Sequence, residues 1–180
     1  RPMITGKRLG IFGLGDIGTR IGHIGEAFGM SVAYSSRTPK PQYSWTYHEH
    51  LVDLARAVDF LIAVAPGGKA TFHAVNAGVL DALGPKGYLV SIGRGTVVDT
   101  EALVAALNAG GIAGAGVDVF EAEPGIPESL RNAPNVVLTP HVGGVSSDVQ
   151  IISARLILGN IAALAAGKPL LSPVPEMAPA

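Results

Sequence analysis

Three closely spaced glycines near the start of this 180-residue chain constrain its fold more than any other feature. They are Gly13, Gly15 and Gly18, in the pattern Gly-x-Gly-x-x-Gly. The apolar run 9–12 before them has the length of a buried strand. After them, apolar side chains recur at helical spacing from Ile17 to Phe28, and Gly29 stands where a helix would end. A strand, a glycine turn and a helix in this order predict a site for the pyrophosphate of a dinucleotide.

Each glycine has a steric reason in such a turn. Gly13 would take the backbone conformation of a tight turn, Gly15 would let a pyrophosphate approach the main chain, and Gly18 would let the helix pack closely on the strand. Free N–H groups at the helix start would face the pyrophosphate, together with Asp16 and Ile17. The alternative is a glycine-rich turn without a ligand, since the chain has 24 glycines.

Composition narrows the class of protein. With 48% apolar and 15% charged residues the chain should fold, and its net charge of −1 gives no general attraction to nucleic acid or to an anionic membrane. The absence of cysteine excludes disulfides and thiolate chemistry. No uninterrupted apolar run reaches ~18 residues, so we expect no membrane span and a cytoplasmic protein. The chain begins at Arg1 rather than at a methionine, so we expect it to be a piece of a longer one.

Strand and helix patterns alternate along the chain, which predicts a doubly wound α/β fold with a mostly parallel sheet, of the Rossmann type. We expect strands at 9–12, 31–35, 42–47, 60–64, 88–92, 113–119 and 135–138. We expect helices at 17–28, 48–58, 71–83, 101–109 and 147–166. Residues 1–168 should form one dinucleotide-binding domain, and residues 169–180 an irregular, proline-rich tail.

A polar loop after the second predicted strand bears on the choice of cofactor. Domains that prefer NAD usually carry an acidic residue here, ~20 residues beyond the glycines, for the ribose 2′-hydroxyl. This loop has no acid and instead contains Ser36, Arg37, Thr38 and Lys40. A guanidinium can pair with a 2′-phosphate through two hydrogen bonds, and an ammonium adds a point charge. The loop therefore predicts a preference for NADP over NAD, the alternative being an ordinary exposed basic loop.

Three charged or titratable residues, Arg94, Glu123 and His141, each follow the carboxyl end of a predicted strand. Such loops converge at one edge of a parallel sheet, so the three can meet beside a nicotinamide. Hydride transfer to a ketone requires a proton, which a histidine can supply near neutral pH. A neighbouring carboxylate would orient the ring, and an arginine could hold a substrate carboxylate and polarise the adjacent carbonyl. Taken singly, each could be an ordinary surface or turn residue.

Four motifs together resemble the coenzyme-binding domain of the D-isomer-specific 2-hydroxyacid dehydrogenases. They occupy residues 13–18, 91–95, 116–124 and 134–144, and the resemblance extends over about residues 5–168. Segment 34–41 is further similar to the glyoxylate/hydroxypyruvate reductase branch, whose members prefer NADPH. The family builds its active site between two domains. The resemblance therefore implies that the substrate domain, which comes mainly from earlier sequence, is absent from this chain.

The resemblance also implies a role for each residue. Arg94 would bind the substrate's carboxylate and carbonyl, and His141 would be the general acid in reduction and the base in oxidation, both beside the cofactor. Glu123 would pair with His141 and favour its protonated form, and Asp118 would lie near the nicotinamide amide. Further cofactor contacts are expected at Val64, Ala65, Pro66, Thr71, Ile92, Gly93, Gly143 and Gly144.

These observations favour an NAD(P)-dependent reductase of a small 2-oxo acid such as glyoxylate or hydroxypyruvate, acting as a homodimer. Two alternatives remain at this point: a non-enzymatic dinucleotide sensor of the corepressor type, and a dehydrogenase of another small acid such as phosphite. We expect no metal site, because His48 and His50 are two residues apart and do not share a helix face. We interpret His73 as a surface or packing residue.

Overall fold

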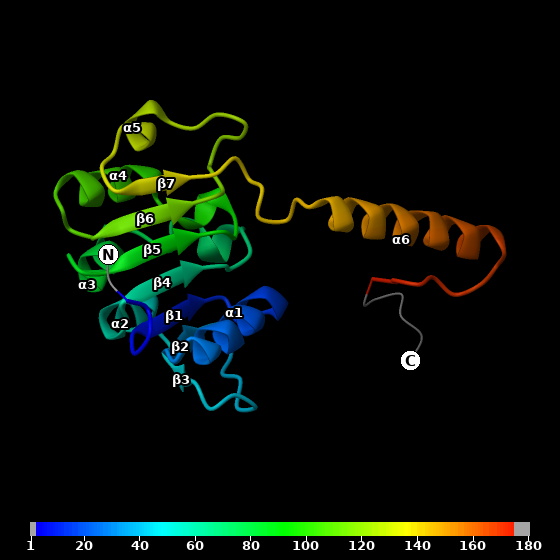
Figure 1. Ribbon diagram of the computed structural model, residues 1–180, viewed down its shortest axis with the longest axis horizontal. Coiled ribbons are helices and arrows are strands. Elements are labelled where there is room, and N and C mark those ends of the chain that lie inside the picture. Colours follow the sequence, from blue (N-terminus) through cyan, green and yellow to red (C-terminus); the bar gives the residue numbers. More distant parts are fainter. Residues whose placement is uncertain (1–2, 175–180) are drawn as a thin grey trace. The chain divides into compact units, whose positions relative to one another are not determined.

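The computed structural model describes residues 3–174 and divides into two compact units, Arg1–His141 and Val142–Ala180. The first unit is built on a seven-stranded sheet (Figure 1). The strands are β1 (Arg8–Phe12), β2 (Ser31–Ser35), β3 (Thr46–Tyr47), β4 (Phe60–Ala63), β5 (Tyr88–Ser91), β6 (Gly114–Val117) and β7 (Val136–Leu138). Their order is β3-β2-β1-β4-β5-β6-β7, and neighbouring strands pair in parallel. The predicted doubly wound, parallel α/β fold is confirmed.

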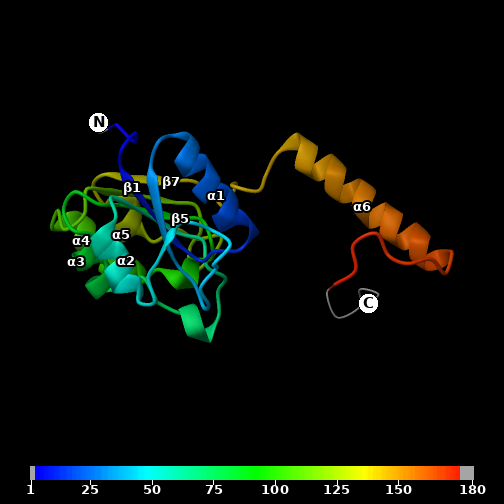
Figure 2. The ribbon, with the colours of Figure 1, turned by 90° about the horizontal axis from the view of Figure 1, so that it is seen from below.

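The helices cover both faces of this sheet. In the first unit they are α1 (Asp16–Ala27), α2 (Leu51–Ala57), α3 (Ala77–Leu83), α4 (Thr100–Asn108) and α5 (Glu128–Arg131). The strand order reverses between β3 and β4, and right-handed crossovers then place α1 on one face and α2, α3 and α4 on the other (Figure 2). The reversal leaves β1 and β4 side by side, so the loops that follow these two strands diverge at a topological switch point, where ligands bind in such sheets.

Helix α1 confirms the predicted helix but differs in the face that it buries. Gly18, Gly22 and Gly25 are its buried residues, whereas the side chains of Ile24 and Phe28 are more than half exposed. A Cβ on Gly22 would overlap the Trp45 ring, and one on Gly25 would lie 2.5 Å from Leu9 Cδ2. The helix therefore packs largely through its glycine backbone. Of the apolar residues that predicted it, Ile21 packs against the core, whereas Ile17, Ile24 and Phe28 are exposed.

The predicted helix 71–83 is wrong in its first half. Residues Lys69–Thr71 form a 3₁₀ turn, His73 has a φ of 49°, and α3 begins only at Ala77. The side chain of Asn76 accepts a hydrogen bond from the Val79 N–H at 3.2 Å and so caps the shorter helix. Helix α5 and a 3₁₀ turn at Gly95–Val97 were not expected from the sequence. Asp99 caps α4, since its side chain accepts a hydrogen bond from the Ala102 N–H at 3.0 Å.

The second unit contains α6 (Ser147–Ala165), which confirms the predicted long helix. Ser146 caps its start, and near its end the Asn160 carboxamide oxygen accepts the Leu171 N–H at 2.8 Å, which folds the following segment back on the helix. By length and average composition, α6 is apolar enough to cross a membrane. We expected no membrane span because the sequence has no uninterrupted apolar run of sufficient length. A mean hydropathy over the helix allows isolated charged residues such as Asp148 and Arg155. Residues 169–174 contain no helix or strand, and 175–180 lie outside the described residues. The 1–168 extent of the domain stays a prediction.

Candidate cofactor and catalytic site

The glycine turn lies where β1 ends and α1 begins. Gly13 has a φ of 101°, and a Cβ there would lie 2.6 Å from the Ala65 backbone. Gly15 is the N-cap of α1, and a Cβ on it would meet nothing within 4 Å. Gly18 has no room for a side chain, because a Cβ would overlap the Gly13 carbonyl oxygen. The turn thus presents open backbone at the start of a 12-residue helix, a geometry that accepts a pyrophosphate.

Two clefts flank this turn. The first has a volume of about 850 Å³ and the second about 630 Å³, and both are lined by Gly15 and by the 64–66 segment that follows β4. Of the other predicted site residues, the first cleft is lined by Asp16, Ile17, Gly18, Ile92, Gly93, Arg94, Glu123 and His141. The second is lined by Gly13, Ser36, Arg37, Thr38, Lys40 and Thr71. The sequence-predicted catalytic and 2′-phosphate residues are therefore on opposite sides of one glycine turn.

Three predicted cofactor contacts line neither cleft. Asp118 is buried at the end of β6, where it accepts a hydrogen bond from the Thr139 hydroxyl and so holds the ends of β6 and β7 together. Gly143 and Gly144 belong to the second unit. A cofactor role for these three residues stays a prediction.

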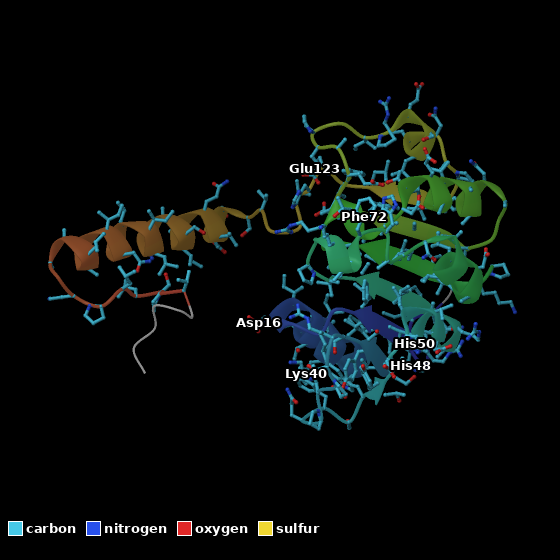
Figure 3. The ribbon with its side chains drawn as sticks, turned by 180° about the vertical axis from the view of Figure 1, so that it is seen from behind. Asp16, Lys40, His48, His50, Phe72 and Glu123 are labelled. Carbon is cyan, nitrogen blue, oxygen red and sulfur yellow. The ribbon has the colours of Figure 1, made fainter. Side chains whose placement is uncertain are left out.

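The second cleft contains the basic loop. Its backbone is fixed by the Ser36 hydroxyl, which donates to the Thr38 carbonyl at 2.7 Å, and by the Lys40 N–H, which donates to the Tyr34 hydroxyl at 2.7 Å. Neither Arg37 nor Lys40 forms an ion pair with any residue of the described chain, so both cations can meet a ligand (Lys40 is labelled in Figure 3). The cleft also contains Glu49, which sequence reasoning missed because it follows β3 rather than β2.

Arg94 reaches the first cleft from the turn after β5. Its Nη1 donates to the Gly93 carbonyl oxygen at 2.8 Å, which uses one of the guanidinium donors and leaves the others for a ligand. A Cβ on Gly67 would lie 3.2 Å from the Arg94 Cβ, so the loop after β4 packs directly on the Arg94 side chain. The arginine is therefore oriented by its own backbone and by the segment that separates the two clefts.

His141 and Glu123 form an ion pair in the same cleft. His141 Nδ1 lies 2.8 Å from Glu123 Oε2, and Glu123 Oε1 accepts the Phe120 N–H at 3.0 Å. The hydrogen bond from His141, followed by that from Phe120, holds the pKa of the Glu123 carboxyl below its usual range. With Nδ1 bound to a carboxylate, Nε2 is the nitrogen that can exchange a proton with a substrate. His141 has a φ of 52°, the kind of conformation that persists where surrounding contacts impose it.

The geometry defines a dinucleotide-binding α/β domain with an arginine and a histidine–glutamate pair at its ligand edge. The chain matches the D-isomer specific 2-hydroxyacid dehydrogenase family, NAD binding domain, over residues 2–143. The chain therefore belongs to this family, as the sequence motifs indicated.

Individual relatives agree with this assignment. Hydroxyphenylpyruvate reductase of Plectranthus scutellarioides is 48% identical over 170 residues, and a glyoxylate/hydroxypyruvate reductase of Arabidopsis thaliana is 46% identical over 170; each match covers 94% of this chain and 54% of the relative. An NADPH-dependent glyoxylate/hydroxypyruvate reductase of Sinorhizobium meliloti, solved with NADP and malonate, is similar with a TM-score of 0.89 and 50% identity, over 96% of this chain and 54% of that one. The chain thus spans about half the length of the relatives that it matches.

Proposed function

We propose that the protein to which this chain belongs is an NADPH-preferring reductase of small 2-oxo acids, such as glyoxylate or hydroxypyruvate. The observation that carries the proposal is the convergence of Arg94 and the His141–Glu123 pair in one cleft beside the glycine turn. The names of the relatives support the substrate class, since three of them are reductases of 2-oxo acids. None of these relatives is a corepressor or a phosphite dehydrogenase.

The residues fit a bound dinucleotide. The open backbone at Gly15 and the start of α1 would take the pyrophosphate, the cleft at Arg37 and Lys40 the 2′-phosphate, and the cleft at Arg94 the nicotinamide end. When bound, NADPH supplies the hydride. Everything else that the reaction requires from this half of the active site comes from side chains of the first unit.

The catalytic residues act in a fixed order on a 2-oxo acid. The Arg94 donors that are not bound to Gly93 hold the substrate carboxylate and draw electron density toward the carbonyl oxygen. As that oxygen gains negative charge, His141 Nε2 gives it a proton, and the positive charge on the ring before transfer is stabilised by Glu123 at 2.8 Å from Nδ1. In oxidation the neutral ring accepts the proton back. These residues therefore support reversible reduction of a carbonyl next to a carboxylate.

The direct test is an assay of the full-length protein with glyoxylate, hydroxypyruvate and hydroxyphenylpyruvate, following NADPH oxidation. We expect turnover with at least one of these acids and a preference for NADPH over NADH. Tight NADPH binding without turnover of any 2-oxo acid would contradict the reductase and favour a dinucleotide sensor. Turnover of phosphite alone would favour the other alternative.

A homodimer in the cytoplasm is part of the proposal. Exposed apolar side chains on α1, including Ile24 and Phe28, and along α6 offer surface that a second subunit or the missing half of the protein would cover. Sedimentation of the full-length protein should give a dimer, and a monomer at micromolar concentration would refute this. Cell fractionation should place the protein in the soluble fraction, whereas recovery in membranes would show that α6 has another role.

A further inference from the structure

We propose that Glu121 and His73 form a second carboxylate–imidazole pair whose role is to position the catalytic loop, the segment 120–124. The inference rests on the reductase function proposed above, and it concerns two residues to which that function gives no chemical step, although Glu121 lines the first cleft. Neither residue was assigned a function from the sequence. The pair is separated by 48 positions along the chain, yet it joins the loop after β4 to the loop after β6.

The Glu121 carboxylate is held from two sides. Its Oε2 lies 3.0 Å from His73 Nε2, and its Oε1 accepts both the Thr100 hydroxyl at 2.7 Å and the Thr100 N–H at 3.2 Å. Burial alone would raise the pKa of Glu121, but the hydrogen bonds from His73 and Thr100 outweigh it and lower that pKa. Glu121 is thus a carboxylate with three hydrogen-bonding contacts, which link His73 to the start of α4.

The backbone of the catalytic loop has little freedom around this anchor. A Cβ on Gly95 would overlap the Phe120 carbonyl carbon, so the Arg94–Gly95 turn lies directly against the peptide between Phe120 and Glu121. On the same loop, the Phe120 N–H donates to Glu123 at 3.0 Å. A displacement of Glu121 would therefore move the Arg94 turn and Glu123 together.

His73 connects this anchor to the cofactor side of the site. Its N–H donates to the Thr96 carbonyl at 2.8 Å, and its Nδ1 lies 3.7 Å from Asp99, the cap of α4. The segment just before it lines the second cleft and is folded by the Thr71 hydroxyl, which donates to the Pro66 carbonyl at 2.6 Å. Phe72 stacks on the His73 ring at 4.0 Å (Phe72 and Glu123 are labelled in Figure 3). The His73–Glu121 pair thus connects the loop after β4, which lines the second cleft, to the loop after β6, which lines the first.

Two substitutions in the full-length protein test the role. Glu121→Gln keeps one acceptor oxygen, which is enough for both hydrogen bonds from Thr100, and removes the negative charge beside His73. His73→Asn removes the ring but suits the φ of 49°, since asparagine tolerates this conformation better than most residues. Glu101→Gln is the matched control, because Glu101 is exposed on the first turn of α4 and forms no ion pair in the described chain.

A positioning role predicts a specific pattern. Each variant should lose about 10-fold to 100-fold in kcat for the 2-oxo acid, because a small displacement of catalytic groups is enough for such a loss. The NADPH Kd should change less than threefold, the double variant should be no slower than either single one, and the control should match wild type. Hydrogen exchange at the Phe120 and Thr100 amides should accelerate in both variants but not in the control.

The outcomes separate the two proposals. A wild-type protein without reductase activity would refute the proposed function, and the amide exchange would then decide alone whether the pair holds the loop. An active wild type whose variants keep normal kcat and normal exchange would overturn the positioning role. Unfolding of both variants at 25 °C, seen by circular dichroism, would overturn it as well and make the pair a stability element.

Discussion

Two carboxylates of one loop, Glu121 and Glu123, each pair with a histidine. The two pairs differ in whether the second ring nitrogen of the histidine also lies near a carboxylate. Glu123 meets His141 at 2.8 Å and Glu121 meets His73 at 3.0 Å, and both histidines have positive φ. The two nitrogens of the His73 ring lie 3.0 Å from Glu121 and 3.7 Å from Asp99, whereas within residues 3–174 His141 has a carboxylate partner only at Nδ1. The His141 side chain is 47% exposed, against 31% for His73. A histidine with a carboxylate near each ring nitrogen is suited to holding a loop, whereas a histidine whose Nε2 has no carboxylate partner is suited to proton transfer.

The largest effect should follow from removing the free nitrogen. His141→Ala in the full-length protein should lower kcat for 2-oxo acid reduction by ~10²-fold to 10⁴-fold, because general acid catalysis is lost. The NADPH Kd should hardly change, because the pyrophosphate lies at the glycine turn. Steady-state kinetics and a binding titration measure both numbers. Near-normal rates would mean that the two pairs have been given the wrong roles.

A smaller effect should follow in the second cleft. Arg37→Ala should remove the charge-assisted contact that we propose with the 2′-phosphate, at a cost of about 1.5–3 kcal/mol, or roughly 10-fold to 100-fold in NADPH affinity. NADH affinity should stay the same, because NADH has no phosphate there. Fluorescence titration with both cofactors, using the single tryptophan, Trp45, provides the measurement. Equal wild-type affinities for NADPH and NADH would refute the proposed preference.

The acidic partner of His141 should set the pH range rather than the maximal rate. The hydrogen bonds from His141 and Phe120 lower the pKa of Glu123, so at neutral pH a carboxylate faces His141 Nδ1 at 2.8 Å. Reduction needs the His141 ring protonated, so its rate should fall as pH rises. Oxidation needs the neutral ring, so its rate should rise with pH. In Glu123→Gln both the fall in reduction and the rise in oxidation should begin at lower pH. An unchanged pH–rate profile would show that Glu123 does not control the proton donor.

The smallest effect concerns an ion pair at the opposite, amino-terminal edge of the sheet. Arg8 and Asp59 are linked at 2.8 Å, and hydrogen bonds from Arg8 lower the pKa of Asp59 from 3.8 to about 2. This contribution to stability is present above about pH 4 and is lost as pH falls through 2, where the carboxylate is protonated. Because Arg8 is half exposed, Asp59→Asn should cost only about 1 kcal/mol at neutral pH.

Urea unfolding of wild type and Asp59→Asn at pH 7 and at acid pH checks this. The difference between the two proteins should shrink as the pH falls from about 4 toward 2. Turnover by the full-length protein should not change, since neither Arg8 nor Asp59 lines a cleft. A loss of activity without a loss of stability would contradict a purely structural role at this edge.

The ligand edge was predictable from the sequence because it follows from topology. Parallel strands end at one edge, so Arg94, Glu123 and His141, each placed just after a strand, had to approach one another. The glycine turn was predictable from a local pattern, because its three glycines stand between a strand pattern and a helix pattern. The pairing of His73 with Glu121 could not be predicted from topology. His73 lies ten residues beyond β4, in a segment that was expected to be helical.

The remaining differences come from tertiary contacts that leave no local pattern. The glycine face of α1 is buried because the Trp45 ring packs against Gly22. The residues around Gly22 in the sequence do not predict this contact, because Trp45 lies 23 residues later. The helix 71–83 is broken because the His73 N–H bonds to Thr96 rather than to a residue four positions earlier. Glu49 lines the second cleft from beyond β3, so the presence of a carboxylate in that cleft could not be predicted from the β2 loop alone.

In our proposal the His141–Glu123 pair transfers the proton while the His73–Glu121 pair holds the loop. Single-turnover reduction of a 2-oxo acid by the NADPH-loaded full-length protein distinguishes these two roles, with wild type, His141→Ala and His73→Asn compared across pH. We expect His141→Ala to be slow at every pH and to have lost the wild-type decline at high pH. His73→Asn should be slower than wild type but keep that decline at the same pH. A His73→Asn protein that loses the decline, or a His141→Ala protein that keeps it, would contradict the account.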